Sequence, residues 1–355
     1  MSQAEARAAI PRGQLAVALA PRDTADAREQ IARAATVADL AELRLDLMES
    51  FDLEQILADH PLPLIVTYRP RREGGRFDGD EQQRLRVLRH AAELGAEYLD
   101  LEHDAVMHLG QHGAARVIVS RHDYQHMPGD LNDWWTRQRD LGADIVKVVG
   151  TAHDPRDNLR VLELLERADT PTIALCMGPL GLPSRVLGPR ARSCFLTFAA
   201  LDERGGTAPG QVSVQAMRDV YRVPALTPAT RVYGVLTDQG DDTAAAAINA
   251  ILAARDTDAV CVPWVAPTDP TLLLAESTHL VRGFAVAPAW QRAAFQIARE
   301  HDAAATREGR CDALVAVVSN GISGYAGRWL GNLEATTDWW LESASNPIAG
   351  SPSSS

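Results

Sequence analysis

Short apolar runs recur along much of the chain, each long enough for one buried strand. The eight runs are Leu15–Leu19, Ala41–Leu45, Leu64–Thr67, Tyr98–Leu101, Val117–Ser120, Ile145–Val148, Thr172–Cys176 and Cys194–Phe198. Between them lie stretches with the apolar spacing of helices, such as Asp26–Ala35, Gln82–Leu94 and Asp157–Arg167. Strands and helices that alternate eight times predict an α/β fold of the (β/α)₈ type, a TIM barrel. We place this barrel at residues 13–223.

A second, smaller α/β domain is expected after the barrel. The segment Pro224–Pro228 is a plausible linker, and a new strand-like run begins at Arg231–Val235. We assign residues 229–342 to this domain. The final segment, Ser343–Ser355, is rich in Ser, Pro and Ala and predicts a disordered tail.

Composition and charge narrow the class of protein. The chain has 355 residues, 46% of them hydrophobic, and a net charge of -12, so a polyanion such as nucleic acid is a poor partner. No apolar run approaches the length needed to span a membrane, and the beginning of the chain lacks a secretory pattern. Four widely separated cysteines form no metal-binding or disulfide pattern. We therefore expect a cytoplasmic protein without a metal or membrane partner.

Lys147 is the only lysine among 35 basic residues. Arginine can replace lysine wherever a fixed charge suffices, but it cannot become a neutral amine near pH 7. A desolvated lysine can do so, because its pKa can fall to about 7–8. Lys147 also interrupts the β-branched run Ala143–Val149, where a buried charge is costly. The alternatives are a buried structural ion pair or the chance survival of one lysine.

Polar residues follow several predicted strands at the points where they end. Glu42 and Arg44 lie on the second strand and Arg69 just past the third. His122 is expected just past the fifth strand, Lys147 lies on the sixth, and Met177 and Arg185 are expected after the seventh. Active sites of TIM barrels form at the carboxyl ends of the strands, so these residues should converge on one mouth.

The order and spacing of several motifs resemble the type I 3-dehydroquinate dehydratase family over nearly all of residues 13–223. The matching pieces are Glu42–Asp46, Thr67–Arg69 with Glu73–Gly75, Asp100–Glu102, Ser120–Tyr124, Asp144–Lys147, Met177–Gly178, Ser184–Arg185 and Ala208–Gln211. No single piece is specific, but the complete ordered set is.

This resemblance implies a lyase that dehydrates 3-dehydroquinate through a lysine Schiff base and needs no cofactor. Lys147 would form the imine, and His122 would transfer protons as general base and acid. Glu73 would orient His122 or raise its basicity. Arg185 would clamp the substrate carboxylate. The other implied substrate-binding residues are Glu42, Arg44, Arg69, Met177, Phe198, Thr207 and Gln211.

The Gly-rich segment Gly205–Gln211 has the composition of a mobile flap over the mouth, although an ordinary loop could have the same composition.

We also expect the protein to form a homodimer.

The second domain faintly resembles the substrate-binding half of shikimate dehydrogenase. The similar pieces include Ala259–Trp264, Gly283–Pro288 and Gly324–Gly331. The catalytic lysine of that family is missing, Ala326 and Arg328 stand where its Asn and Asp are expected, and no G-x-G-x-x-G nucleotide motif follows. We therefore expect a degenerate module that packs, dimerises or regulates. Trp329, Trp339 and Trp340 are either core residues or an interface.

Three functions are compatible with the sequence. The first is an active dehydratase of the shikimate pathway. The second is another Schiff-base barrel such as an aldolase, which the Ser120–Tyr124 motif and Arg185 disfavour. The third is a non-catalytic sensor that binds a metabolite of that pathway, which the presence of both Lys147 and His122 disfavours.

Overall fold

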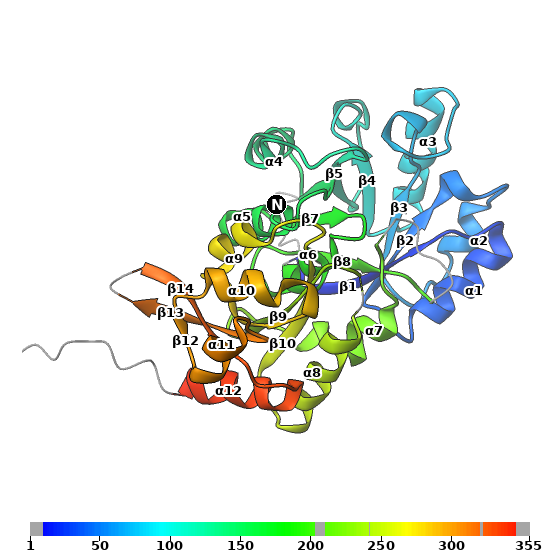
Figure 1. The fold of residues 1–355 in the computed structure, drawn as a ribbon. Coiled ribbons are helices and arrows are strands. Elements are labelled where there is room, and N and C mark those ends of the chain that lie inside the picture. Colours follow the sequence, from blue (N-terminus) through cyan, green and yellow to red (C-terminus); the bar gives the residue numbers. More distant parts are fainter. Residues whose placement is uncertain (1–9, 203–209, 241, 320–321, 346–355) are drawn as a thin grey trace, which may run out of the picture.

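The structure is a computed structural model that describes residues 10–202, 210–240, 242–319 and 322–345. These residues form an eight-stranded sheet and then a six-stranded sheet. Figure 1 shows the first sheet in blue to green beside the second in yellow to red. A barrel followed by a smaller α/β domain is thus confirmed. Among the described residues, no helix has the length and apolarity that crossing a membrane requires.

All neighbouring strands of the first sheet pair in parallel, in the order β7-β6-β5-β4-β3-β2-β1-β8. Backbone hydrogen bonds from Thr172 to Ser193 (2.7 Å) and from Phe195 to Thr172 (2.8 Å) join the two ends, so the barrel is nearly closed. The strands are β1 (Gln14–Leu19), β2 (Leu40–Arg44), β3 (Leu64–Thr67), β4 (Tyr98–Glu102), β5 (Arg116–Asp123), β6 (Ile145–Thr151), β7 (Thr172–Met177) and β8 (Leu196–Ala199).

Helices follow most strands and cover the outside of the barrel. They are α1 (Thr24–Ala34), α2 (Leu53–Leu57), α3 (Glu81–Glu93), α4 (Leu131–Asp140), α5 (Asp157–Arg167), α6 (Leu182–Leu187) and α7 (Val214–Asp219). Asp23, Asp80 and Asp130 begin α1, α3 and α4 by accepting a hydrogen bond from a backbone amide in the first turn.

Two strand ends differ from the sequence-based expectation. Pairing of β5 with β6 continues through His122 with Val149 and Asp123 with Gly150. His122 therefore lies within β5 and not past it, and Met177 is the last residue of β7. The reason is that a parallel strand continues as long as its neighbour offers backbone partners, which an apolar run does not reveal.

Apolar side chains bury both faces of the barrel strands. Ile65, Ile118 and Ile145 belong to the interior cluster, and Leu43 and Leu85 belong to the cluster between strands and helices. Burial on two sides explains why the strands read as continuous apolar runs. Polar side chains that interrupt them are consequently conspicuous.

The second sheet is mixed, with the order β10-β9-β11-β13-β14-β12. Strands β9, β10 and β11 pair in parallel, whereas β13 is antiparallel to β11 and β14. The strands are β9 (Arg231–Thr237), β10 (Ala259–Val265), β11 (Val281–Val286), β12 (Glu300–His301), β13 (Ala313–Ser319) and β14 (Ile322–Arg328). The helices are α8 (Thr243–Ala254), α9 (Thr271–Ser277), α10 (Gln291–Ile297), α11 (Ala303–Glu308) and α12 (Leu333–Ser345).

The tryptophans of this domain belong mainly to its core. Trp340 is fully buried and Trp339 nearly so, in the cluster beneath α8 and α12. Trp329 is partly buried, with the Arg310 guanidinium 4.2 Å from its ring centre. Helix α12 continues to Ser345, so the first three residues of the predicted tail are helical because the amphipathic helix extends past Trp340. Residues 346–355 lie outside the described part of the chain.

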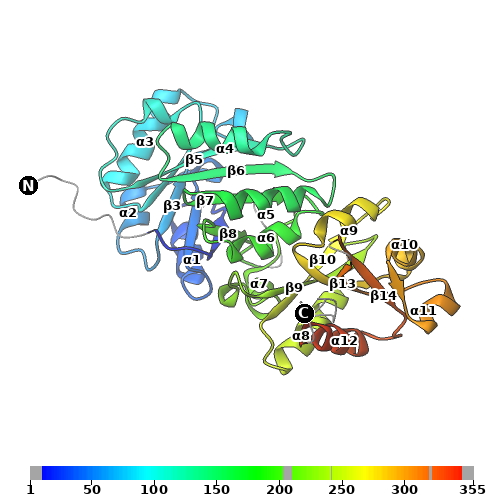
Figure 2. The same ribbon diagram turned by 90° about the vertical axis from the view of Figure 1, so that its left-hand side faces the viewer.

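Helix α6 lies between the barrel and the second sheet and packs against β10 (Figure 2). Around it, the Arg190 guanidinium donates hydrogen bonds to the carbonyl oxygens of Pro228 (3.2 Å) and Thr230 (2.9 Å). Arg222 donates to the carbonyl of Ala259 at 2.6 Å. The predicted linker is thus held against the barrel, and the two domains share one packed boundary.

Candidate active site

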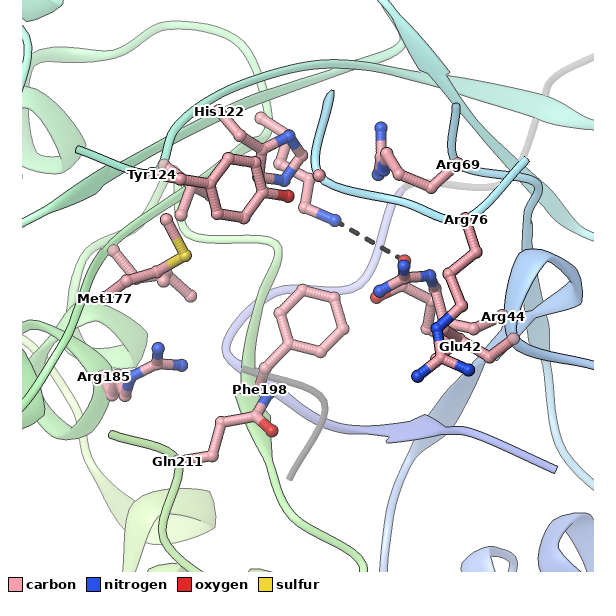
Figure 3. Close-up of a pocket in the computed structure, with 15 residues that line it drawn as sticks. Glu42, Arg44, Arg69, Arg76, His122, Tyr124, Met177, Arg185, Phe198 and Gln211 are labelled. Atoms are coloured by element: carbon pink, nitrogen blue, oxygen red, sulfur yellow. Dashed lines mark ion pairs between the residues drawn. The ribbon is translucent and has the colours of Figure 1, made fainter. Parts of the chain in front are cut away.

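A cavity of about 270 Å³ opens at the carboxyl ends of the barrel strands. Most of the predicted site residues line it: Glu42, Arg44, Arg69, His122, Lys147, Met177, Arg185, Phe198 and Gln211. Figure 3 shows Arg185 facing Arg44 and Arg76 across the cavity, with Phe198 between them. Of the remaining predictions, Glu73 contacts His122, while Thr207 and most of the predicted flap lie outside the described residues.

Lys147 extends from β6 into this cavity and is only 4% exposed. Its Nζ donates a hydrogen bond to Asp100 Oδ2 at 2.7 Å and lies 3.8 Å from Glu42 Oε1. The Phe198 ring centre lies 4.8 Å from the same nitrogen. The lysine therefore forms a buried ion pair, the structural alternative considered above, yet it also faces the cavity.

Asp100 is held as a carboxylate by its neighbours. Burial alone would raise its pKa, but the Arg69 guanidinium and the Lys147 ammonium hold the pKa of Asp100 well below its usual range. Arg69 Nη2 lies 2.8 Å from Asp100 Oδ1, and the Ser120 hydroxyl donates to the same oxygen at 2.6 Å. Because one oxygen is occupied by these two donors, the other is directed at Lys147.

Arg69 holds several buried acidic groups together. Its Nη1 lies 2.7 Å from Glu102 and donates to the Ser120 hydroxyl at 2.8 Å. Arg84 contacts the second Glu102 oxygen at 2.7 Å. We expected Arg69 to bind substrate hydroxyls. The structure adds that it positions Asp100, because these carboxylates would otherwise be buried without counter-charges.

His122 and Glu73 form a second pair at the cavity. His122 Nδ1 lies 3.4 Å from Glu73 Oε2, and the same oxygen accepts the backbone N–H of His122 at 3.1 Å. Glu73 ends the short 3₁₀ turn Arg71–Glu73, after which Gly74 adopts φ = 74°. Burial raises the pKa of Glu73 to about 7. At neutral pH the carboxyl is therefore divided between its two protonation states.

The environment of His122 lowers its basicity, and the orienting role expected of Glu73 stays a prediction. Burial, followed by the positive charges of Arg69 and Lys147, holds the pKa of His122 well below its usual value near 6.5. The side chain of His122 is 8% exposed. Its imidazole is consequently neutral near pH 7 and has the form that a general base requires. Sequence spacing could not reveal the burial and the two cations that decide this direction.

The opposite side of the cavity is also fixed by hydrogen bonds. Arg44 pairs with Asp46 through two hydrogen bonds of 2.9 and 2.8 Å, and Asp46 also accepts the backbone N–H groups of Arg69 and Arg76. Glu42 accepts the Thr67 hydroxyl at 2.7 Å. Arg44 and Glu42 therefore have defined orientations in which substrate hydroxyls can be recognised.

Arg185 approaches the cavity from α6 and is almost fully buried. Burial lowers the pKa of Arg185 to about 10, so the guanidinium remains charged near pH 7. Its backbone carbonyl accepts the Thr197 hydroxyl at 2.8 Å, which ties α6 to β8. A buried cation that opens onto a cavity is suited to a carboxylate ligand.

The sequence reasoning missed several site residues. Asp100 and Ser120 belong to motifs noted above, but nothing in their spacing assigned them to Lys147. Tyr124 lines the cavity, stacks on His122 with ring centres 5.7 Å apart, and donates its hydroxyl proton to the Glu73 carbonyl at 2.8 Å. Arg76 also lines the cavity. The signal for Tyr124 was its place two residues after His122, directly after the last residue of β5.

Within the described residues, no group of His, Cys, Asp and Glu has the arrangement of a metal site. The site instead combines a primary amine, a neutral imidazole and an arginine around one cavity. An amine can condense with a ketone, an imidazole can move the adjacent proton, and the arginine can hold a carboxylate.

Comparison with known sequences supports the same interpretation. The family described as type I 3-dehydroquinase matches residues 15–227. A 3-dehydroquinate dehydratase of Pyrococcus abyssi is 33% identical over 52% of this chain and 87% of its own length.

A longer relative matches the second domain as well. The chloroplastic bifunctional 3-dehydroquinate dehydratase/shikimate dehydrogenase of Arabidopsis thaliana is 35% identical over 332 residues, which cover 90% of this chain. The match therefore extends beyond the barrel, and the region after it is similar to a shikimate dehydrogenase. This chain spans only 55% of the length of that relative.

The fold has counterparts among solved structures. A type I 3-dehydroquinate dehydratase from Clostridium difficile superposes with a TM-score of 0.53 and 24% identity, over 60% of this chain and 92% of its own. The enzyme from Geobacillus kaustophilus gives the same TM-score over 61% of this chain. Both comparisons show that the barrel fold is shared.

Proposed function

Because the chain belongs to the type I 3-dehydroquinase family, we propose that it dehydrates 3-dehydroquinate to 3-dehydroshikimate through an imine on Lys147. The observation that carries this proposal is that Lys147, His122 and Arg185 all open onto one cavity. The first supplies an amine, the second a neutral base and the third a carboxylate clamp. The proposed reaction requires all three groups, and the chain has all three.

The first step is attack of the Lys147 amine on the substrate ketone. Lys147 must lose a proton to attack, and Asp100 Oδ2 at 2.7 Å is positioned to stabilise the cation until this happens. The ketone oxygen leaves as water with the two protons that the Lys147 ammonium gives up in total, and the resulting iminium draws electrons toward nitrogen. Positioning by Asp100 keeps Nζ directed into the cavity.

The second step is proton transfer by His122. The neutral imidazole takes the proton next to the iminium carbon, and the electrons released move toward the Lys147 nitrogen. The imidazolium then returns the proton to the departing hydroxyl, which leaves as water. Water finally hydrolyses the imine and restores the amine. One histidine thus serves both halves of the elimination.

A non-catalytic sensor is the second candidate, because the buried Lys147–Asp100 ion pair would also suit a structural lysine. Borohydride trapping distinguishes the two. Incubation with 3-dehydroquinate followed by reduction should leave a mass adduct on Lys147, together with growth of the enone absorbance of the product. Absence of both signals in folded protein would favour the sensor.

Glu73→Gln should change the pH profile of the reaction. In the wild type, kcat/KM should fall below an apparent pKa of about 7, because protonated Glu73 cannot stabilise the imidazolium that forms on His122. The pKa of His122 itself lies too low to produce this limb. In the variant the limb near pH 7 should disappear and kcat should fall about tenfold, the effect of one pKa unit on the imidazolium. An unchanged profile from pH 5 to 9 would contradict this role.

Arg185→Lys should raise KM while leaving kcat less affected. Lysine keeps the charge but loses the planar pair of N–H donors that a carboxylate accepts. We therefore expect the KM for 3-dehydroquinate to rise about 10–100-fold. Steady-state kinetics would measure this change. Arg137→Lys on the exposed face of α4 is the matched control and should behave as the wild type. Equal KM values for both variants would show that Arg185 does not bind the substrate.

We also propose that the second domain has no oxidoreductase activity. It has no lysine, and Arg328 of β14 is used in packing, with its guanidinium 4.6 Å from the Trp339 ring centre. Purified protein should therefore not reduce 3-dehydroshikimate with either nicotinamide cofactor, as monitored at 340 nm. A cofactor-dependent rate well above the blank would overturn this assignment.

A further inference from the structure

A second cavity, of about 440 Å³, lies in the six-stranded sheet, far from the barrel residues that carry the proposed chemistry. It is on the face of the sheet that α8 and α12 cover (Figure 1). Its lining comes from the amino-terminal parts of β9 and β11, from β13 and from the last turns of α12. Nothing in the dehydration reaction uses this cavity.

Two arginines converge on this cavity from neighbouring strands. Arg231 begins β9, and Arg282 is the second residue of β11, which pairs with β9. Both guanidinium groups act electrostatically on the same buried hydroxyl, that of Tyr233, whose pKa is raised by burial and lowered by these charges. Within residues 10–202, 210–240, 242–319 and 322–345, neither arginine forms an ion pair with a carboxylate. The cavity therefore has uncompensated positive charge in a chain of net charge -12.

Tyr233 contributes a third polar group. The residue is fully buried, and its hydroxyl proton has no acceptor among the described residues. Leaving such a donor unsatisfied costs free energy that a ligand oxygen could recover. The Tyr233 ring is held in place because it stacks on Trp340, with the two ring centres 4.5 Å apart. Trp340 is itself fixed, since its indole N–H donates a hydrogen bond to the Leu314 carbonyl at 2.9 Å.

Apart from Ser343, the remaining lining side chains are mainly apolar. Val315 and Val317 of β13 line it and are nearly buried. Hydrocarbon walls penalise a doubly charged, strongly hydrated group such as phosphate more than a singly charged one, because desolvation costs more for the higher charge. A single carboxylate is satisfied by a guanidinium fork, and an apolar body can cover the valines.

We propose that the second domain binds a small monocarboxylate with an apolar body, its carboxylate held by Arg231, Arg282 and Tyr233 and its body packed on Val315 and Val317. This site is separate from the barrel cavity and does not depend on the dehydratase assignment. It would give a ligand-binding role to a domain whose ancestral catalysis is absent.

Calorimetric titration of the full-length protein with benzoate tests the proposal, with benzamide as the neutral isostere and inorganic phosphate as a generic anion. We expect benzoate to bind and the other two to bind at least about tenfold more weakly, the minimum loss for a charged hydrogen bond left unmade. Equal binding of benzamide or of phosphate would overturn the carboxylate assignment. Absence of benzoate binding would refute the proposed binding site.

Variants locate the binding event. Arg282→Gln should weaken benzoate binding at least about tenfold without affecting the fold, because Arg282 is exposed. Arg292→Gln on α10 makes the same charge change away from the cavity and should bind as the wild type. Arg185→Gln should also retain binding. Loss of binding in Arg185→Gln but not in Arg282→Gln would place benzoate in the barrel and refute the proposal.

Discussion

Lys147→Arg should abolish dehydration of 3-dehydroquinate, with kcat reduced by about 10⁴-fold or more, the scale seen when a nucleophile is removed. Arginine preserves the positive charge and can still pair with Asp100, so the substitution removes only the ability to become a neutral amine. Product formation is measured by enone absorbance. The borohydride adduct, measured by mass, should vanish with the activity.

Arginine is the suitable substitute at position 147 because it keeps the positive charge. Because Lys147 is buried between Asp100 and Glu42, a neutral substitute such as alanine would remove the cation that these two carboxylates share and would destabilise the barrel. The melting temperature of the arginine variant checks that the barrel is intact. A variant that kept wild-type turnover would refute the imine mechanism, while the proposed carboxylate site of the second domain would be unaffected.

His122→Asn should lower kcat by about 10²–10⁴-fold, the usual contribution of a general acid or base. Imine formation does not depend on His122 in the proposed mechanism, so the borohydride adduct on Lys147 should persist. His122→Asn should therefore lose turnover but keep the adduct, whereas Lys147→Arg should lose both. Rapid quenching followed by mass spectrometry measures the adduct.

His126→Asn is the matched control for His122→Asn. His126 is an exposed residue four positions further along the chain and does not line the cavity. It should retain wild-type kcat and KM. If His122→Asn lost the adduct as well as turnover, the histidine would be needed for imine formation, and the division of roles between the two side chains would have to be revised.

The position of α6 connects the two domains to the proposed chemistry. This short helix carries Arg185 on its inner side and packs against β10 on its outer side. Asn158 and Ser184 secure it further, since the Asn158 side-chain oxygen accepts the Ser184 amide at 3.0 Å. The second domain thus contributes to the burial of a helix that faces the barrel cavity.

Much of the barrel and several site residues could be predicted from the sequence. Each strand needs a run of apolar residues because both of its faces are buried, so all eight strands appeared in the pattern. Lys147 was conspicuous because it interrupts such a run and because no other lysine exists in the chain. The carboxyl-end rule for barrels then placed Arg69, His122 and Arg185 around it.

The remaining features depend on contacts between residues far apart in the sequence. Asp100 meets Lys147 and Arg69 across a distance of dozens of residues, and no local pattern specifies which oxygen faces which cation. The direction of the His122 pKa depends on burial and on these same cations, whereas the sequence interpretation considered only the neighbouring acid Glu73. The second cavity likewise forms only because the neighbouring strands β9 and β11 bring Arg231 and Arg282 to one lining.

The sequence by itself determined the order of strands and helices and the barrel class, and it singled out Lys147 as the candidate amine, because these follow from local periodicity and from what each side chain can do chemically. The tertiary structure alone decided the protonation states, the ion-pair partners and the second cavity. Those properties depend on burial and on the distance between charges, which strand pairing and packing fix only when the chain is folded.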